Sequence, residues 1–316
     1  MTKPPTPECP VFLVGAERSG TTVLRLMLDS HPELAWVNEF EYAVDGMDGA
    51  DWPAAADYVR SLETHRIFRA ARYEIDPTLA YPDLVRSFLE QRRARAGKAF
   101  VGATVHRHLD RLLRIWPDAR FLHLARDPRD VARSCIGMGW AGNVWTGVER
   151  WVEAETLWAR LSVLLEKDRF LELRYEKLIV RPEEELGRIC DFLGLRWSAE
   201  MLEYGARSSY ERPDPTLVEQ WRRTLSTREI QLVEARTGEL LETVGYTGSG
   251  LPAIRVGPLA RVHLRAQDRV ARARFAWRVF GWRLRLADIL SRRLRLRAWQ
   301  RSVALRKNEV ISNRIR

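Results

Sequence analysis

A loop rich in glycine and hydroxyl residues is the first part of this chain that could do chemistry. Residues 15–22 read Gly-Ala-Glu-Arg-Ser-Gly-Thr-Thr and stand between a short apolar run and a helical pattern. Glycines let the backbone approach an anion closely, and the free N–H groups at a helix start point toward it. Arg18 adds a planar cation suited to phosphate or sulfate. The loop therefore predicts an anion site. An ordinary glycine-containing turn can look the same, and the Gly-Lys-Ser/Thr ending typical of magnesium nucleotide sites is missing.

A second candidate anion site lies further along the chain. Residues 121–134 read as a strand with Arg126 at its carboxyl end, followed by a helix that Asp127 can cap. Ser134 comes two turns into that helix, so Arg126 and Ser134 can converge on one phosphate near the helix start. Two plainer interpretations stay open, because Arg126 can pair with Asp130 and Ser134 can be an ordinary helix residue.

In this order the two motifs resemble those of the sulfotransferases that use 3′-phosphoadenosine 5′-phosphosulfate (PAPS) as donor. The likeness covers about residues 11–246 and includes the segments 175–194 and 221–226. It implies transfer of a sulfuryl group from PAPS to an acceptor hydroxyl, on a P-loop-like α/β fold. The loop would bind the 5′-phosphosulfate, and the second motif would bind the 3′-phosphate. The donor-binding residues implied by the resemblance are Arg18, Ser19, Gly20, Thr21, Thr22, Arg126, Ser134 and Tyr175. Tyr175 can equally be a core tyrosine at a strand end.

Within that family, the stretch from Arg18 to Glu39 is most similar to tyrosylprotein sulfotransferases and their bacterial relatives. The resemblance implies that two residues are catalytic. Arg18 would contact the phosphosulfate, and Glu39 would take the proton of the acceptor hydroxyl. Glu41 is a rival base, because it lies on the same side as Glu39 if the segment is extended. Glu39 can also be a solvated loop carboxylate.

One position departs from the family pattern. Many relatives carry a lysine near the transferred group, in the segment before the second motif, and here Thr104 stands at that position. His106 or Arg107 could supply the missing charge, although His106, His108 and His123 also read as helix or core histidines. No cluster of His, Cys and carboxylate residues has metal-ligand spacing, and we expect transfer without a metal.

The main region alternates short apolar runs with helical patterns, which predicts an α/β fold with a parallel sheet flanked by helices on both faces. The expected strands are 11–16, 100–102, 121–125 and 170–175. The expected helices run from about residue 21 to Ser30, before Pro32, and over 147–167, 181–194 and 227–244.

Residues 40–98 lack this alternation and predict an irregular helical insertion between the first and second strands. We expect the insertion to shape the acceptor pocket. The aromatic side chains available as pocket walls are Tyr42, Trp52, Tyr58, Phe68, Tyr73 and Tyr81. The acceptor itself stays open, and a protein tyrosine, a glycan, a lipid or a metabolite would each supply a hydroxyl.

The net charge of +10 is distributed unevenly. Residues 251–316 carry 18 Lys and Arg against three acidic residues, a net charge of +15, whereas residues 1–250 carry −5. The linker-like segment 248–250 divides the chain into a sulfotransferase domain, 1–250, and a basic tail, 251–316. Apolar residues keep helical spacing among the arginines of the tail: Phe275, Val279, Trp282, Leu286, Ile289, Leu290 and Leu294. The tail therefore predicts a basic amphipathic helix that meets an anionic membrane, a partner subunit or the main domain. Its apolar stripe argues against nucleic acid.

Two other functions fit parts of the sequence. A nucleotide kinase of P-loop type also needs a phosphate loop followed by arginines, but the missing Gly-Lys-Ser/Thr counts against it. A membrane-surface or nucleic-acid-binding protein would act through the arginine-rich tail. The three cysteines are widely spaced, and the sequence shows neither a signal-peptide pattern nor an apolar run of membrane-spanning length. These features predict a cytoplasmic protein that could contact a membrane peripherally.

Overall fold

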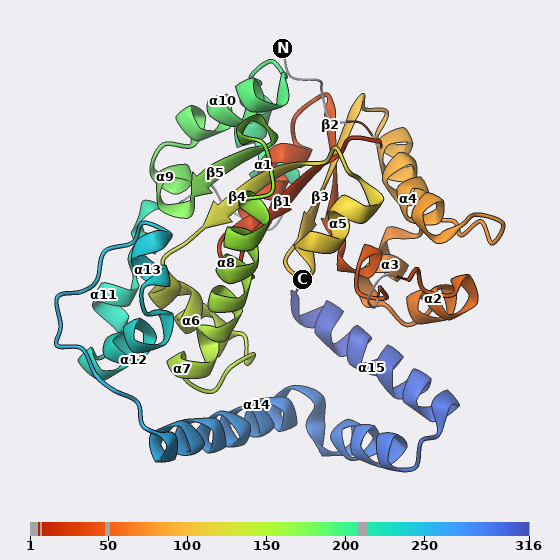
Figure 1. Ribbon diagram of the computed structural model, residues 1–316. Helices are drawn as coiled ribbons and strands as arrows, with labels where there is room; N and C mark the ends of the chain where they lie inside the picture. The colour runs from red at the N-terminus through yellow and green to blue at the C-terminus, as the bar shows by residue number, and fades with distance from the viewer. Residues whose placement is uncertain (1–5, 7, 48–50, 208–213, 316) are drawn as a thin grey trace.

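A five-stranded, wholly parallel sheet lies at the centre of the computed structural model, which describes residues 6, 8–47, 51–207 and 214–315 (Figure 1). The strand order is β2-β3-β1-β4-β5. The bounds are β1 Val11–Val14, β2 Leu34–Glu39, β3 Phe100–Val105, β4 Arg120–Ala125 and β5 Phe170–Arg174. Parallel neighbours need crossover connections, so helices must lie on both faces of such a sheet.

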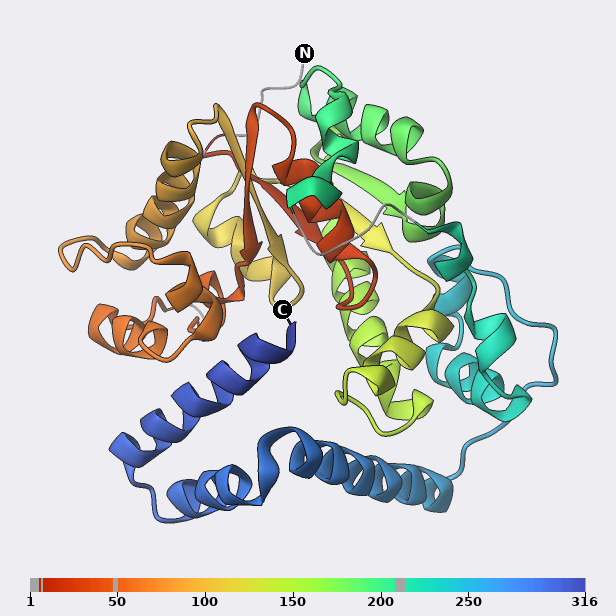
Figure 2. The same cartoon turned by 180° about the vertical axis from the view of Figure 1, so that it is seen from behind.

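Two helical layers cover the sheet (Figures 1 and 2). One layer packs on the face of Leu13 and contains α1 Thr21–Asp29, α9 Tyr175–Val180 and α10 Pro182–Leu193. The other packs on the face of Phe12 and contains α4 Tyr81–Ala96, α5 Leu109–Ile115 and α8 Glu149–Ser162. All four residues of β1 are fully buried, as expected for a central parallel strand. The predicted fold class is confirmed.

The strand β2 is the main departure from the sequence prediction. It pairs with β3, so the helical insertion connects β2 to β3 and does not separate the first strand from the second. The predicted place of the insertion in the strand order was therefore wrong. Residues 34–37 are buried whichever face they point to, so the segment shows no polar alternation that would mark it as a strand.

The other elements agree with the predicted pattern, with shifted ends. The strand at Phe100 continues to Val105, and the helix expected over 227–244 divides at Gly238. The insertion contains η1 Glu41–Ala43, α2 Ala55–Leu62 and α3 Arg66–Ala71 before α4. The remaining elements before the tail are α6 Pro128–Gly137, α7 Val144–Gly147, η2 Lys167–Arg169, η3 Ala199–Leu202, η4 Tyr204–Arg207, η5 Pro215–Leu217, α11 Trp221–Thr224, α12 Thr227–Thr237 and α13 Leu240–Thr243.

The C-terminal region is helical, as predicted, but it forms two helices. These are α14 Pro258–Arg293, which kinks at Gly281, and α15 Arg297–Ile315. Asp268 fixes α14 to the main region, because its Oδ1 accepts hydrogen bonds from the Gly142 N–H at 2.7 Å and the Thr146 hydroxyl at 2.9 Å. On α15, Asn308 donates to the Thr64 carbonyl of the insertion at 3.1 Å. Both views show the tail crossing the side of the molecule toward which the strands point (Figures 1 and 2).

Candidate active site

The predicted site residues follow the strand order along the carboxyl edge of the sheet. Glu39 ends β2, His106 follows β3, the phosphate-loop candidate follows β1, Arg126 follows β4 and Tyr175 follows β5. The helix α1, which connects β1 to β2, and the helix α8, which lies between β4 and β5, pack on opposite faces of the sheet. The crevice between the neighbouring strands β1 and β4 is therefore a topological switch point. Ligands of open α/β sheets bind at such crevices.

The loop after β1 has a backbone that only certain residues can adopt. Gly15 and Gly20 have φ values of 145° and 92°, and a Cβ on Gly20 would lie 2.2 Å from the Tyr175 ring. Arg18 also has a positive φ, 73°, a strained conformation typical of functional loops. Within the described residues, the Ser19 hydroxyl is fully buried and has no hydrogen-bond partner, and no side chain caps α1. The loop therefore holds unused donors where a helix start favours an anion.

The structure brings the two motifs together through Arg18. The Arg18 Nε donates a hydrogen bond to the Ser134 Oγ at 2.9 Å, and the Arg126 Nη1 donates to the Arg18 carbonyl at 3.1 Å. The Arg126 guanidinium also lies over the Tyr175 ring, 4.1 Å from its centroid. Two arginines, one hydroxyl and one aromatic ring thus gather around the loop.

The alternative partner of Arg126 is farther away. The closest approach of its guanidinium to the Asp130 carboxylate is 3.9 Å, and Asp130 Oδ1 accepts a hydrogen bond from the Trp221 N–H at 2.8 Å instead. Burial raises the pKa of Asp130 to about 6. Among the described residues, the Arg126 Nε has no partner. The Arg126 Nη2 donates to the Leu217 carbonyl at 3.4 Å, so within the described residues the buried Nε is the guanidinium nitrogen that lacks a partner.

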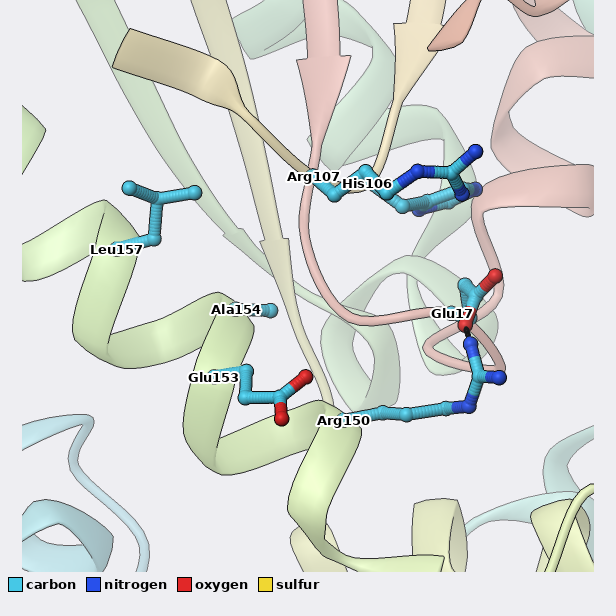
Figure 3. Close-up of a pocket in the computed structure, with 7 residues that line it drawn as sticks. All are labelled: Glu17, His106, Arg107, Arg150, Glu153, Ala154 and Leu157. Carbon is cyan, nitrogen blue, oxygen red and sulfur yellow. Dashed lines mark hydrogen bonds and ion pairs between the residues drawn. The ribbon is translucent and has the colours of Figure 1, made fainter. Parts of the chain in front are cut away.

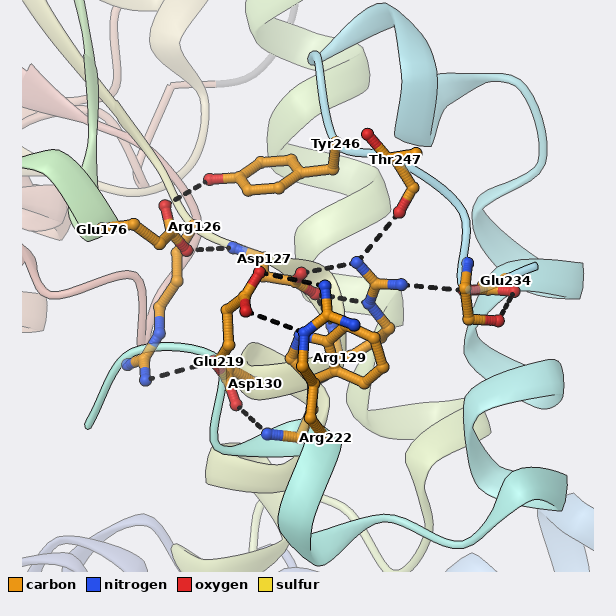
Figure 4. A network of polar contacts seen from close by, with 12 residues as sticks. Arg126, Asp127, Arg129, Asp130, Glu176, Glu219, Arg222, Glu234, Tyr246 and Thr247 are labelled. Atoms are coloured by element: carbon orange, nitrogen blue, oxygen red, sulfur yellow. Dashed lines mark hydrogen bonds and ion pairs between the residues drawn. The ribbon is translucent and has the colours of Figure 1, made fainter. Parts of the chain in front are cut away.

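A buried polar network holds the second motif in place (Figure 4). Asp127 caps α6 and accepts two hydrogen bonds from the Arg129 guanidinium, at 2.8 and 2.6 Å. The same guanidinium reaches Glu234 on α12 at 2.9 Å. Glu176 accepts from the Asp127 N–H at 3.0 Å and from the Tyr246 hydroxyl at 2.9 Å. Charge-assisted bonds of this kind fix the start of α6, which positions Arg126 and Ser134.

The two carboxylates proposed as bases have different environments. Glu39 is exposed at the end of β2, where an acceptor can reach it. Glu41 lies in the turn η1, so the segment is not extended there. It is buried, and its Oε1 accepts a hydrogen bond from the His106 N–H at 3.0 Å. Burial, assisted by the nearby Glu39 charge, raises the pKa of Glu41 to about 7. Glu41 is thus buried and hydrogen-bonded, whereas Glu39 is exposed, and which of the two serves as the base stays a prediction.

His106 is a candidate that the sequence did not identify as catalytic. Its Nδ1 lies 3.0 Å from the Gly15 carbonyl oxygen, and a carbonyl can only accept, so Nδ1 carries the hydrogen. The neutral ring therefore presents a bare Nε2. Burial lowers the pKa of His106, which favours this neutral form. The signal in the sequence that could have identified His106 as a site residue is its position directly after a central strand.

Thr104, at the position of the family lysine, brings no charge to the site. Its side chain is buried on β3, and its hydroxyl accepts a hydrogen bond from the Trp36 Nε1 at 2.9 Å. Arg107 is held by Asp45 through two hydrogen bonds, at 2.7 and 2.5 Å.

A pocket opens beside the loop, between the end of β3 and α8 (Figure 3). It is lined by Glu17, His106, Arg107, Arg150, Glu153, Ala154 and Leu157. The aromatic residues expected as acceptor walls lie elsewhere. Tyr42, Tyr58, Phe68 and Tyr81 are buried against one another and form the core of the insertion. Their apolar area stabilises the insertion, so these four do not face an open pocket.

The family model described as "Sulfotransferase family" matches residues 10–199. The chain belongs to the sulfotransferase family. This membership confirms the resemblance drawn from the two motifs and sets the kinase interpretation aside. Protein-tyrosine sulfotransferase 2 of Gallus gallus is 27% identical over 205 residues, which cover 61% of this chain and 53% of that protein. Nodulation protein NoeE of Sinorhizobium fredii is 27% identical over 282 residues, which cover 75% and 66% of the two chains. The chain thus spans about half the length of the chicken relative.

Two solved sulfotransferase domains share the fold. The domain from the Synechococcus PCC 7002 olefin synthase has a TM-score of 0.54 and 21% identity, with coverage of 79% of this chain and 98% of that one. The domain from the curacin biosynthetic pathway has a TM-score of 0.53 and 16% identity, with coverage of 79% and 100%. Within the described part of this sulfotransferase-family chain, no three His, Cys, Asp or Glu side chains gather as metal ligands, and no helix is long and apolar enough to span a membrane.

Proposed function

We propose that this protein transfers the sulfuryl group of PAPS to the hydroxyl of an acceptor. The observation that carries the proposal is the convergence of Arg18, Ser134 and Arg126 on a loop that contains the buried, unpartnered Ser19 hydroxyl. A donor with phosphates at both ends of a nucleoside needs two anion sites a short distance apart. The ends of β1 and β4, which are neighbours in the sheet, would provide them.

The residues on this edge divide into a donor end and an acceptor end. The loop amides and hydroxyls of Ser19, Thr21 and Thr22 would hold the 5′-phosphosulfate, with Gly20 allowing the close approach. Arg126 and Ser134 would hold the 3′-phosphate, and Tyr175 would lie along the nucleotide. Glu39 and His106, on the other side of β1, would face the acceptor. The order of strands thus supports an in-line path from acceptor to donor.

In the proposed reaction the acceptor oxygen attacks sulfur as the bond from sulfur to the bridging phosphate oxygen breaks. The electron pair of that bond stays on the phosphate oxygen, and Arg18 would stabilise the charge that develops there. The acceptor proton passes to Glu39, the exposed carboxylate at the end of β2. His106, which lines the pocket and has its hydrogen on Nδ1, is the second candidate for this proton.

Donor binding is tested by calorimetry with adenosine 3′,5′-bisphosphate and AMP. The bisphosphate should bind much more tightly than AMP, and Arg126→Ala should narrow that difference specifically. Arg133→Ala is the matched control, because Arg133 is on the same helix and binds Gln220. Equal affinity of the wild type for both nucleotides would remove the 3′-phosphate assignment.

The base is tested by single substitutions that keep volume. Glu39→Gln should bind the bisphosphate like the wild type and lose about 10²- to 10⁴-fold in transfer from radiolabelled PAPS, the usual range for general-base catalysis. The acceptors are a panel of phenols, tyrosine peptides, glycans and lipid alcohols, with water as the minimal acceptor. Full activity of Glu39→Gln with a large loss in His106→Gln would move the role to the histidine.

The same panel would identify the acceptor class. The relatives include proteins named for protein tyrosine and, in Mycobacterium bovis, a sulfotransferase named for omega-hydroxy-beta-dihydromenaquinone-9, which is 29% identical over 159 residues, 43% of this chain and 37% of that protein. We propose a hydroxyl-bearing acceptor and leave tyrosine, glycan, lipid and metabolite to be separated by the product. The expected role of the insertion, 40–98, in the acceptor pocket also stays a prediction.

We further propose that the basic tail binds an anionic membrane surface. Two of its three acidic residues, Asp268 and Asp288, are buried, and Asp288 is bonded to Arg292 and Lys307 within the tail. The exposed charge is therefore almost wholly positive. Large apolar side chains are exposed among these arginines: Trp277, Trp282, Leu286, Ile289, Leu290, Leu294 and Leu296. Positive charge interleaved with exposed tryptophan and leucine matches an anionic bilayer interface.

Vesicle sedimentation tests this surface. The protein should sediment with phosphatidylglycerol-containing vesicles and not with pure phosphatidylcholine, and added salt should release it. Trp282→Ser should weaken binding several-fold, whereas Trp197→Ser, an exposed tryptophan of the main region, should not. Salt-resistant self-association without vesicle binding would instead identify a second copy of the chain as the partner.

The predicted cytoplasmic location stays a prediction.

A further inference from the structure

Arg150 lines the pocket and has no part in the proposed donor site. It stands in the first turn of α8, far in sequence from the loop of residues 15–22. Its Nη1 forms an ion pair with the Glu17 carboxylate, and Glu17 immediately precedes Arg18 in the loop (Figure 3). The contact therefore attaches α8 directly to the loop that is proposed to hold the phosphosulfate.

Arg150 and Arg18 share one aromatic neighbour. The Arg150 guanidinium lies 5.0 Å from the centroid of the Trp140 ring, and the Arg18 guanidinium lies 5.7 Å from the same ring. Two guanidinium groups against one ring bring two positive charges into the same small region. Glu17 is the anion paired with Arg150 there, and the side chain of Arg150 remains 45% exposed, so a ligand can reach it.

The other cations near the loop are engaged elsewhere. Arg18 donates to Ser134 on α6, Arg126 stacks on Tyr175, and Arg107 is held by two bonds to Asp45. Of the arginines that line the pocket with His106, Arg150 is therefore the one connected to the loop. Arg150 both contacts the loop, through Glu17, and is accessible from the pocket.

We propose that Arg150 is a catalytic residue that contacts the transferred sulfuryl group on the acceptor side of the loop. The inference rests on the proposed function. During transfer the equatorial oxygens of sulfur and the bridging oxygen carry negative charge, and fixed cations beside them lower the barrier. Glu17 holds the guanidinium beside the loop before the donor binds, so the charge needs little reorganisation. The sulfur–oxygen bonds formed and broken are those of the proposed reaction, and Arg150 neither gains nor loses a proton.

A plainer role would give Arg150 only structural importance, as a tether between α8 and the loop. The two roles differ in what Glu17 should do. A tether needs both partners, so Glu17→Gln and Arg150→Ala should then have equal effects on nucleotide binding. A catalytic cation needs only Arg150, and the loss of Glu17 should have a smaller effect.

The experiment compares wild type, Arg150→Ala, Arg150→Lys, Glu17→Gln and the control Arg160→Ala, whose residue is exposed in the last turn of the same helix. Calorimetry measures the affinity of each protein for adenosine 3′,5′-bisphosphate and for PAPS, both without acceptor. The release of radiolabelled sulfate from PAPS to water measures transfer without requiring a known acceptor.

Arg150→Ala should bind the bisphosphate within about twofold of wild type, lose much of the preference for PAPS, and transfer about 10²- to 10³-fold more slowly, as for removal of one preorganised donor. Arg150→Lys should recover part of the rate, because a point charge remains. The transfer rate of Glu17→Gln should fall less than tenfold, and that of Arg160→Ala should equal the wild-type rate. A wild-type rate in Arg150→Ala would overturn the inference alone. Equal losses of bisphosphate affinity well beyond twofold in Arg150→Ala and Glu17→Gln would also overturn it, because they would identify a tether. A wild type that neither binds PAPS nor transfers would overturn the proposed function itself.

Discussion

Glu41 should make the stability of this protein depend on pH in an unusual direction. Its carboxyl is buried, and burial raises its pKa from 4.5 to about 7. Below pH 4.5 the group is protonated in both the folded and the unfolded chain, so it has no effect. Between pH 4.5 and 7 the folded chain keeps a proton that the unfolded chain releases, so the free energy of unfolding falls as pH rises.

The size of the effect follows from the shift. Each pKa unit corresponds to 1.36 kcal/mol, so the ionised carboxylate should lower the free energy of unfolding by about 3 kcal/mol above pH 7. Glu41→Gln keeps the volume and an oxygen that can accept from the His106 N–H at 3.0 Å. The variant should therefore be more stable than wild type at pH 8 by up to about 3 kcal/mol, and equally stable near pH 4.5.

Urea unfolding between pH 4.5 and 8.5 measures this difference. His106, whose pKa is lowered by burial, contributes the opposite slope below its ordinary value, and Asp130 contributes the same slope as Glu41. Asp130 is present in both proteins, so its contribution cancels in the difference between them. The contribution of His106, whose N–H is bonded to Glu41, cancels only in part. Glu33→Gln, at an exposed carboxylate, is the control for the chemical change from glutamate to glutamine. A constant difference between wild type and Glu41→Gln across this range would refute the reasoning.

Three further substitutions test the loop, the polar network and the tail. Gly20→Ala places a Cβ 2.2 Å from the Tyr175 ring at a positive φ, and calorimetry should show at least a tenfold loss of bisphosphate affinity. Arg129→Met leaves Asp127 without its buried partner and should lower the free energy of unfolding by about 3–5 kcal/mol in urea. Phe275→Ala removes the ring packed against Gly139, and trypsin should then cleave the tail severalfold faster.

Each of these variants has a matched control. Gly248→Ala meets no atom within 4 Å and should bind nucleotide normally. Arg222→Met removes an exposed pair with Glu219 and should cost less than about 1 kcal/mol. Trp277→Ala removes an exposed ring of the tail and should leave trypsin cleavage unchanged. Equal effects in a variant and its control would contradict the corresponding contact.

The strand, loop and helix of the proposed donor end were predictable because their signals are local. A strand, a glycine loop and a helix start occupy consecutive residues, so the sequence from 11 to 29 predicts both the element and the direction of its free amides. The second motif likewise places Arg126 and Ser134 on one strand–helix unit. The structure adds that Ser134 is bonded to Arg18. That contact joins residues 116 positions apart and has no signature in the sequence.

The acceptor end was less predictable for the same reason. The Glu17–Arg150 ion pair joins the loop to a helix that is distant in sequence, and a charged residue in a helix usually indicates only a solvated face. The strand β2 was missed because its first four residues are buried and show no alternation. Tyr42 and Tyr81 were expected to line a pocket, but an insertion of this size needs its own core, and large aromatic residues supply it.

The contacts of the tail connect it to the same loop. The Phe275 ring of α14 packs against Gly139, and the next residue, Trp140, carries both Arg18 and Arg150 on its ring. Phe275 and Trp140 therefore connect α14 to Arg18 in the loop proposed to hold the phosphosulfate. If donor binding orders Trp140, it must also favour the docked position of Phe275, because coupling between two binding events is reciprocal. Docking of Phe275 on the main region and binding of the donor would then favour each other by the same factor.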